Sequence, residues 1–254
     1  MNYPFDDYLN SKIENVPKKS LCSDNDVFIN ISLNYSFSHP NMRYSPCNNS
    51  EDVFIDGITN GAAWYPTSGG MQDFNYWKFG CYEVSLEISC CKYPSESEIE
   101  KNWLENKNSL IEYLKIANTG IRGFITYKNG VPAKFVSVAI DSREPLFKTN
   151  ENGEYYRILL PGNYSLHVSI NCGSHIYHTS FELKTNLLEM NITLWVNESQ
   201  EHSHHLNRYP IFCETNPAPK CSTDQHHNLG SANNGFNFYL TILSFIIIFV
   251  TSQI

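Results

Sequence analysis

The chain lacks an excess of basic charge, with 18 Lys and Arg residues against 26 Asp and Glu residues among its 254. Proteins that bind nucleic acid neutralise its phosphates with clustered Lys and Arg, and no such cluster is present, so we exclude nucleic acid as a partner. The acidic balance would suit a cationic substrate, but it is equally typical of an ordinary soluble surface. Composition does not choose between these interpretations.

Long apolar runs are also scarce. The first 19 residues contain no apolar core of the length that a signal peptide needs, so we expect no signal peptide in this chain. The last apolar stretch, 236–250, is shorter than the roughly twenty residues of a membrane-spanning helix. Small residues at 222–223, or at 230–232, are followed by a polar spacer and fit a lipid-anchor signal better. We therefore predict a hydrophobic tail at 236–254, as a lipid-anchor signal or a membrane segment.

Cysteines and glycosylation sequons, by contrast, are plentiful. The chain has eight Cys residues. Six Asn-X-Ser/Thr sequons begin at Asn30, Asn34, Asn48, Asn163, Asn191 and Asn197. Together they indicate an oxidising, secretory setting and a glycoprotein. Cys90 and Cys91 are adjacent and point to opposite sides of a strand, so we expect them to bond to different partners if they bond at all.

Polar and apolar residues alternate over 82–89, which predicts a strand with one buried face. Tyr82, Val84, Leu86 and Ile88 form the apolar set, and Glu83, Ser85, Glu87 and Ser89 form the polar set. Two glutamates therefore lie on the polar face of one strand. Without further information they are interpreted as solvated side chains on a half-exposed strand.

The segments WYPTSGGMQDFNYW and CYEVSLEISCCKYP, which surround this strand, closely resemble the regulatory (N/E) branch of the zinc metallocarboxypeptidases. The resemblance implies that Glu87 is the catalytic general base and that Tyr65 closes over the substrate and donates a hydrogen bond to its terminal region. It also implies that Asp6, in the YPFDD segment, and Gln72 bind a basic C-terminal side chain. From the residues alone, Asp6 would be an ordinary loop aspartate and Tyr65 a loop aromatic.

Zinc is the cofactor that the resemblance implies. In the family two His and one Glu hold the metal, and the general base takes a proton from the metal-bound water. The chain contains no HxxE sequence, and none of its nine His residues occupies a family ligand position. The resemblance therefore places the zinc ligands upstream of Met1, and we expect the chain to lack the N-terminal part of the catalytic domain.

The predicted fold class is α/β, the C-terminal portion of a metallocarboxypeptidase catalytic domain with a mixed sheet and helices, over residues 1–119. A helix is expected at 24–40. A second is expected at 95–118, with Ser95 and Glu98 at capping-box spacing. Its apolar positions recur at helical spacing and predict a buried stripe. That stripe comprises Ile99, Trp103, Leu110, Leu114 and Ala117.

An all-β transthyretin-like sandwich is predicted at 120–197, from roughly seven short strands and a further resemblance to the same family. Two hairpin-like pairs are expected, with corners at Asn129-Gly130 and Gly162-Asn163. Residues 198–235 read as a polar linker. Its tract of three close His at 202–205 is interpreted as solvated rather than as a weak metal site.

The predicted function is that of a zinc-dependent metallocarboxypeptidase that removes C-terminal Arg or Lys from peptides and proteins, truncated here so that the zinc ligands are missing. The alternative is a catalytically inactive cell-surface isoform that acts through its β-sandwich as an interaction module. In both cases we expect the extracellular face of the plasma membrane, reached through the C-terminal tail, or secretion.

Overall fold

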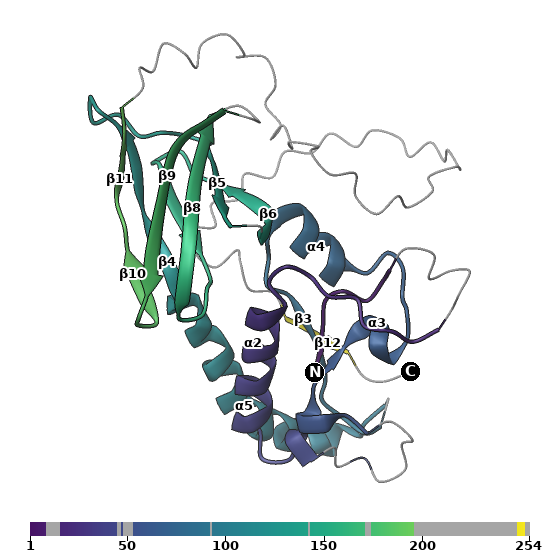
Figure 1. The fold of residues 1–254 in the computed structure, drawn as a ribbon. Coiled ribbons are helices and arrows are strands. Elements are labelled where there is room, and N and C mark those ends of the chain that lie inside the picture. The colour runs from purple at the N-terminus through teal and green to yellow at the C-terminus, as the bar shows by residue number, and fades with distance from the viewer. Residues whose placement is uncertain are drawn as a thin grey trace, which may run out of the picture.

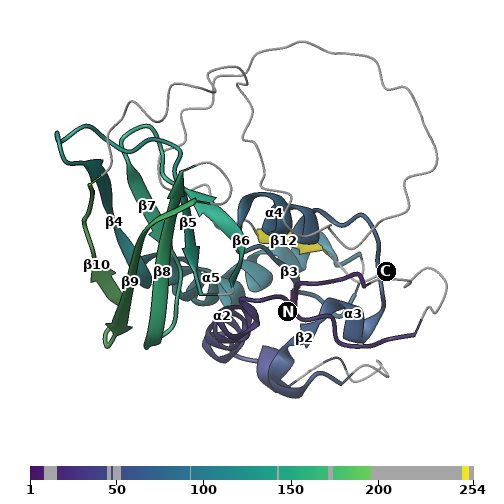
Figure 2. The ribbon, with the colours of Figure 1, turned by 45° about the horizontal axis from the view of Figure 1, so that its top comes forward.

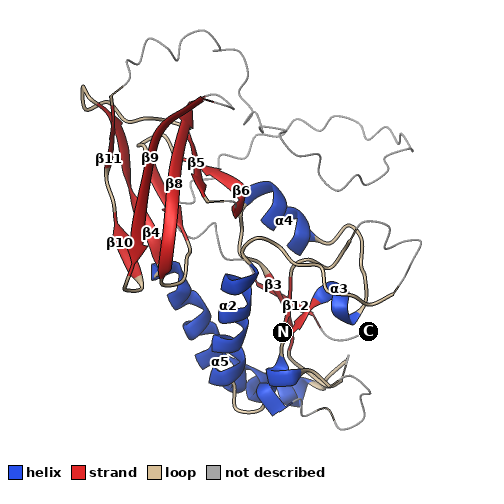
Figure 3. Cartoon of the chain, in the orientation of Figure 1, coloured by secondary structure: helices blue, strands red, loops and turns tan. Residues whose placement is uncertain are grey.

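The computed structural model of the protein describes residues 1–8, 16–44, 47, 53–91, 93–141, 143–170, 174–195 and 248–251. An α/β part formed by the first half of the chain packs beside a pair of β-sheets (Figures 1 and 3). The helices are α2 (Asn25–Ser38), α3 (Gly61–Trp64), α4 (Met71–Phe79) and α5 (Ile99–Lys115). Short 3-10 turns are η1 (Met42–Tyr44), η2 (Ile55–Gly57), η3 (Glu96–Glu98) and η4 (Ile116–Asn118).

A four-stranded mixed sheet in the order β12-β3-β1-β2 lies at the centre of the α/β part. Its strands are β1 (Asn2–Tyr3), β2 (Thr59–Asn60), β3 (Val84–Glu87) and β12 (Ile248–Thr251). Strand β1 runs parallel to β2 and antiparallel to β3. Strand β12, part of the predicted hydrophobic tail, pairs in parallel with the other edge of β3. The remainder of that tail and the predicted linker 198–235 lie outside the described residues.

The helix predicted at 24–40 is confirmed as α2. Its weak helical propensity is offset by tertiary packing, because Val27, Phe28 and Ile31 are all buried in the core below the sheet. Helix α2 packs against α5, and the two lie side by side in both ribbon views (Figures 1 and 2). None of the helices in the described ranges is long and apolar enough to span a bilayer.

The predicted capping box before α5 is confirmed, since Ser95 and Glu98 bond each other's backbone as expected. The predicted buried stripe of this helix is only partly right, because Ile99, Trp103 and Leu114 are 64%, 54% and 47% exposed, whereas Leu110 is partly buried against the core. The buried face instead carries Asn106, Ser109 and Tyr113. Two of these polar groups are satisfied, as Tyr35 donates to Asn106 (2.7 Å) and Tyr113 donates to the Tyr82 carbonyl (2.7 Å). Hydrogen bonds to distant partners therefore help to hold this face of the helix inside.

Two four-stranded sheets form the second part of the molecule and share one hydrophobic core. The strands are β4 (Gly120–Tyr127), β5 (Ser137–Ile140), β6 (Arg143–Lys148), β7 (Glu154–Arg157), β8 (Gly162–Ile170), β9 (Ser174–Leu183), β10 (Leu187–Glu189) and β11 (Ile192–Leu194). One sheet consists of β4 with β7, β10 and β11, and the other has the order β6-β5-β8-β9. Side chains from both sheets, such as Ile125 and Leu166, are completely buried between them. The arrangement is a β-sandwich.

Of the two predicted hairpin-like pairs, only the part of the first next to its corner forms, where Thr126 makes an antiparallel bridge with Pro132. The Asn129-Gly130 corner does turn the chain, with Tyr127 bonded to Val131 and Gly130 to Tyr127. After that corner, however, β5 crosses to the second sheet, while β4 pairs with β7, β10 and β11. Likewise, β7 pairs with β4, and β8 pairs with β5 and β9. The strands before and after each predicted corner, β4 with β5 and β7 with β8, therefore lie in opposite layers of the sandwich.

A buried ion-pair network joins the two parts of the molecule. Asp24, at the start of α2, is fully buried and accepts hydrogen bonds from Arg143 (3.0 Å) and Arg157. Both arginines belong to the β-sandwich, on β6 and β7. The Tyr76 hydroxyl of α4 lies 3.0 Å from Asp24 Oδ2 and 2.7 Å from the Glu144 carbonyl. The orientation of the sandwich is thereby tied to both α2 and α4.

Candidate active site

Asp6 and Gln72, which are far apart in sequence, are in direct contact. Asp6 follows β1, and Gln72 lies in the first turn of α4 with only 2% of its surface exposed. The Gln72 Nε2 atom donates to Asp6 Oδ1 (3.1 Å) and lies 3.4 Å from Asn2 Oδ1. The other end of the amide, Oε1, accepts a hydrogen bond from the Ser85 hydroxyl (3.1 Å). One amide therefore connects Asp6 to the strand that carries Glu87.

Asp73, which the sequence interpretation did not single out, holds the backbone of the same segment. Its carboxylate accepts the amide N–H of Asp6 (2.9 and 3.0 Å to its two oxygens) and that of Asp7 (3.1 Å). Its position beside Gln72 in the first turn of a helix, where acidic residues are favoured, was the available signal. Ser85 was missed as well, although its place on the polar face of the strand was predicted.

Burial raises the pKa values of both carboxyl groups at this site. The pKa of Asp6 rises to about 6, mainly through burial and partly through repulsion from Asp7, against a hydrogen bond from Asn2. The pKa of Asp73 rises to about 7, because burial and the charge of Asp6 outweigh the two backbone hydrogen bonds. A cation placed beside either carboxyl group would therefore stabilise its charged form.

Glu87 is the last residue of β3 and is half-buried, on the same side of the strand as Ser85. The alternation predicted from the sequence is confirmed over Val84 to Glu87, since Val84 and Leu86 are fully buried. The α-amine of Met1 is near enough for the charge of Glu87 to raise its pKa, although burial dominates and lowers that pKa to about 6.

Glu83 departs from the interpretation that both glutamates are solvated. It is completely buried, and its Oε2 accepts a hydrogen bond from Asn75 Nδ2 of α4 (2.5 Å). Its Oε1 has no hydrogen-bond partner among the described residues. Burial raises the pKa of Glu83, and the bond from Asn75 only partly opposes this. The two glutamates of the predicted polar face therefore have different environments.

We expect Glu83→Gln to stabilise the protein at neutral pH. A carboxyl group whose pKa is raised by folding favours the folded state below its unfolded pKa and loses that contribution as pH rises. The free energy of unfolding, measured in urea, should therefore be higher for the variant at about pH 7 and not at about pH 3.5. Glu151→Gln, an exposed control in the turn before β7, should change stability little at either pH. A loss of stability in Glu83→Gln at pH 7 would contradict this expectation.

Tyr65 follows α3 and is 48% exposed, with its ring packed edge-on against Trp64 at 4.7 Å between centroids. Its backbone N–H donates to the Gly61 carbonyl (3.1 Å), which ends the short helix. Gly69 and Gly70 follow it and lead into α4. The structure therefore brings Asp6, Gln72 and the Glu87 strand together, and leaves the Tyr65 side chain exposed on the connecting segment.

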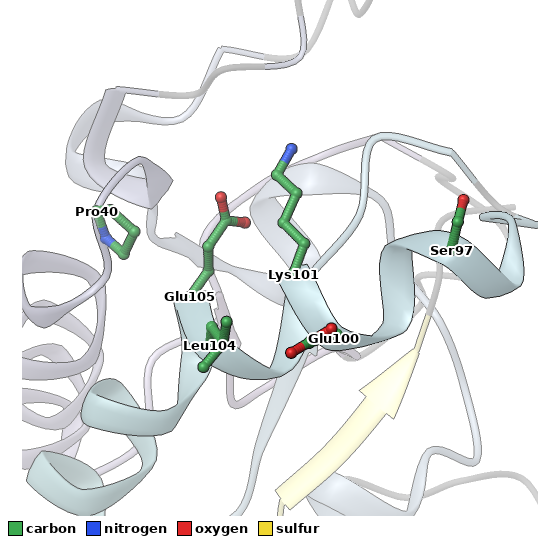
Figure 4. Close-up of a pocket in the computed structure, with 6 residues that line it drawn as sticks. All are labelled: Pro40, Ser97, Glu100, Lys101, Leu104 and Glu105. Atoms are coloured by element: carbon green, nitrogen blue, oxygen red, sulfur yellow. The ribbon is translucent and has the colours of Figure 1, made fainter.

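A hollow elsewhere on the surface lies beside α5 and the residue Pro40 (Figure 4). Figure 4 shows Lys101 and Glu105 projecting from the same side of α5, and Leu104 from the other. None of the four predicted site residues lines this hollow. Within the described residues, no three or more His, Cys, Asp or Glu side chains are grouped so that they could hold a metal ion.

Comparison with known proteins shows what the α/β part is similar to. Residues 1–109 match the family described as zinc carboxypeptidase. This part of the chain therefore has the sequence character of that family. The matched residues contain Asp6, Tyr65, Gln72 and Glu87, so all four candidate site residues lie in the carboxypeptidase segment.

Several carboxypeptidases are similar over a longer stretch. The chain is 41% identical over 172 residues to carboxypeptidase M of Mus musculus, 44% over 170 residues to carboxypeptidase D of Drosophila melanogaster, and 36% over 167 residues to the carboxypeptidase N catalytic chain of Mus musculus. These matches cover 66%, 66% and 65% of this chain, and 38%, 12% and 36% of the respective relatives. The chain thus spans well under half of the length of each relative.

Zinc is the metal that the family name implies. The described residues do not fit a zinc site, because they contain no suitable group of ligands. We therefore derive no chemical step through the metal from this chain. What its own residues provide is a partly buried carboxylate with an amide partner, a second carboxylate at the end of β3, and an exposed tyrosine.

Proposed function

We propose that this chain forms part of a zinc carboxypeptidase that removes C-terminal Arg or Lys from peptides and proteins. The contact between Asp6 and Gln72 is the observation that carries the proposal. A guanidinium or ammonium group pairs with a carboxylate, and charge-assisted hydrogen bonds of this kind are the strong ones. Gln72 is already bonded to Ser85, so its amide is held in place before substrate arrives.

Glu87 and Tyr65 are the proposed catalytic residues. A carboxylate at the end of a strand next to Ser85 can accept a proton within reach of a substrate that is anchored at Asp6. Tyr65 has an exposed hydroxyl-bearing ring on the segment between α3 and α4, from which it can close over the substrate and donate a hydrogen bond. The zinc ligands are proposed to come from carboxypeptidase sequence that this chain does not include.

The β-sandwich is proposed to be a transthyretin-like domain at 120–197, after a carboxypeptidase segment at 1–119. A match that covers 66% of the chain extends beyond residue 109 wherever it is placed, which supports a shared second domain. For location we propose the extracellular face of the plasma membrane or secretion. The disulfide between Cys47 and Cys90 supports an oxidising compartment.

The test is binding of two peptides that differ only in their C-terminal residue, Arg in one and citrulline in the other. Citrulline keeps the length of the side chain and removes its charge. We expect the full chain to bind the Arg peptide at least about tenfold more tightly at neutral pH, which is the loss expected when a charged hydrogen bond becomes neutral. Asp6→Asn should abolish the preference. Equal affinities in the wild-type chain would reject the proposed specificity.

The same preference should depend on pH through Asp6. Because the pKa of Asp6 is raised to about 6, its carboxylate is neutralised below that pH and ceases to attract a cation. The Arg-over-citrulline preference should therefore fall by about tenfold between pH 7 and pH 5. The groups that face Asp6 among the described residues are Asn2, Asp7, Gln72 and Asp73.

A further inference from the structure

The first turn of α4 contacts Asp6 in two different ways. Successive side chains of a helix diverge, so Gln72 and Asp73 approach the segment after β1 from different directions. Gln72 meets the carboxylate of Asp6, and Asp73 meets the backbone of Asp6 and Asp7. If only its carboxylate were bonded, the Asp6 side chain could rotate away. Here helix α4 holds both the backbone and the carboxylate of Asp6.

The contact between Asp73 and the backbone of Asp6 and Asp7 joins one carboxylate to two amide groups. One carboxylate accepts two consecutive amide N–H groups, with N···O distances of 2.9, 3.0 and 3.1 Å. When Asp73 is ionised, these bonds are charge-assisted and about twice as strong as neutral ones. They fix the direction of the peptide planes at Asp6 and Asp7, and therefore the direction in which the Asp6 side chain leaves the backbone.

The space for the Asp6 carboxylate is left open by a glycine. A Cβ atom at Gly61, the first residue of α3, would lie 1.7 Å from Asp6 Oδ1 and 2.7 Å from Asn2 Oδ1. Gly61 lies inside a helix, where alanine is normally favoured, so the backbone itself does not require glycine. The position of the Asp6 carboxylate requires it.

We propose that Asp73 is a positioning residue for substrate specificity: it orients Asp6 toward the basic C-terminal side chain of the peptide. This inference rests on the proposed function, in which Asp6 binds that side chain. Asp73 does not itself touch the substrate and acts through the backbone of Asp6 and Asp7. Gly61 provides the room in which the oriented carboxylate lies.

The charges at the site agree with this role. Asp6 raises the pKa of Asp73, in addition to the larger effect of burial, so the two carboxylates repel each other. The repulsion is relieved when a cationic side chain binds between them and the solvent.

The experiment uses the full chain with Asp73→Ala, Asp73→Asn and Gly61→Ala. Two quantities are measured: the Arg-over-citrulline binding preference as a function of pH, and the hydrogen-exchange protection of the Asp6 and Asp7 amides by NMR. In Asp73→Ala, the Arg-over-citrulline preference at neutral pH should fall by about tenfold or more, and the amides of Asp6 and Asp7 should lose their protection. Asp73→Asn keeps one acceptor oxygen, so it should retain part of the preference and part of the protection.

Gly61→Ala separates the room for the Asp6 carboxylate from the hydrogen bonds of Asp73. It should abolish the preference while the Asp6 and Asp7 amides stay protected. Glu182→Gln, an exposed carboxylate on β9, is the charge-matched control and should change neither quantity. The inference is overturned if Asp73→Ala retains the preference. It is also overturned if Asp73→Ala loses the preference while its Asp6 and Asp7 amides stay protected. A wild-type chain without any preference would reject the proposed function, and amide protection would still report on the Asp73 contact.

Discussion

Asp24→Ala should lower the free energy of unfolding by about 3–5 kcal/mol, the usual cost of removing one partner from a buried ion pair. Asp24 is fully buried and bonds Arg143 and Arg157, and the Arg157 side chain is only 3% exposed. Without Asp24, the Arg157 guanidinium would remain buried beside Tyr76 with no carboxylate. Urea unfolding at neutral pH is the measurement.

Asp26→Ala is the matched control for this prediction. Asp26 also pairs with Arg143 (2.8 Å), but its side chain is 44% exposed. Exposed pairs contribute about 0–1 kcal/mol, so the control should change stability little. If the two variants were equally stable, the network between α2 and the sandwich would not stabilise the fold.

Gly120→Ala should be the second strongly destabilising change, by about 3 kcal/mol or more, from backbone strain combined with steric overlap. Gly120 begins β4 with φ of +107°, and a Cβ there would lie 2.0 Å from the Arg157 carbonyl and 2.6 Å from the Leu159 nitrogen. All of these contacts are with backbone, which cannot move aside cheaply. Thermal and urea unfolding both measure the loss.

Gly130→Ala isolates the strain from the overlap. Gly130 has φ of +82°, and a Cβ there would meet nothing within 4 Å. The control should therefore cost only the left-handed conformation, roughly 1 kcal/mol. A similar loss in both variants would mean that the close approach between β4 and β7 is not what Gly120 protects.

Local signals predicted the elements of the α/β part well, because they depend on neighbours in sequence. The alternation that predicts the Glu87 strand and the capping box at Ser95 both act over a few residues, and both are confirmed. The buried face of α5 depends instead on Tyr35 and Tyr82, which are distant in sequence and supply the hydrogen bonds that hold Asn106 and Tyr113 inside. The apolar periodicity of α5 does not predict such partners.

The candidate site was likewise only partly predictable from the sequence. The resemblance identified Asp6 and Gln72, and the structure brings them into contact. Their supports could not be found from the sequence, because Asp73 acts through backbone amides more than sixty residues away. The environment of Glu83 was equally hidden, since strand alternation describes two faces and does not say that α4 covers one end of the polar face.

The disulfide between Cys47 and Cys90 encloses Tyr65, Gln72 and Glu87 in one covalent loop, with a sequence separation of 43. Closing a loop of that size restricts the unfolded chain and is worth about 4 kcal/mol by chain-entropy reasoning. That contribution exists only where the bond stays oxidised. In a reducing cytosol the segment that bears these three residues would lose its tether, so correct assembly of the site is linked to passage through an oxidising compartment.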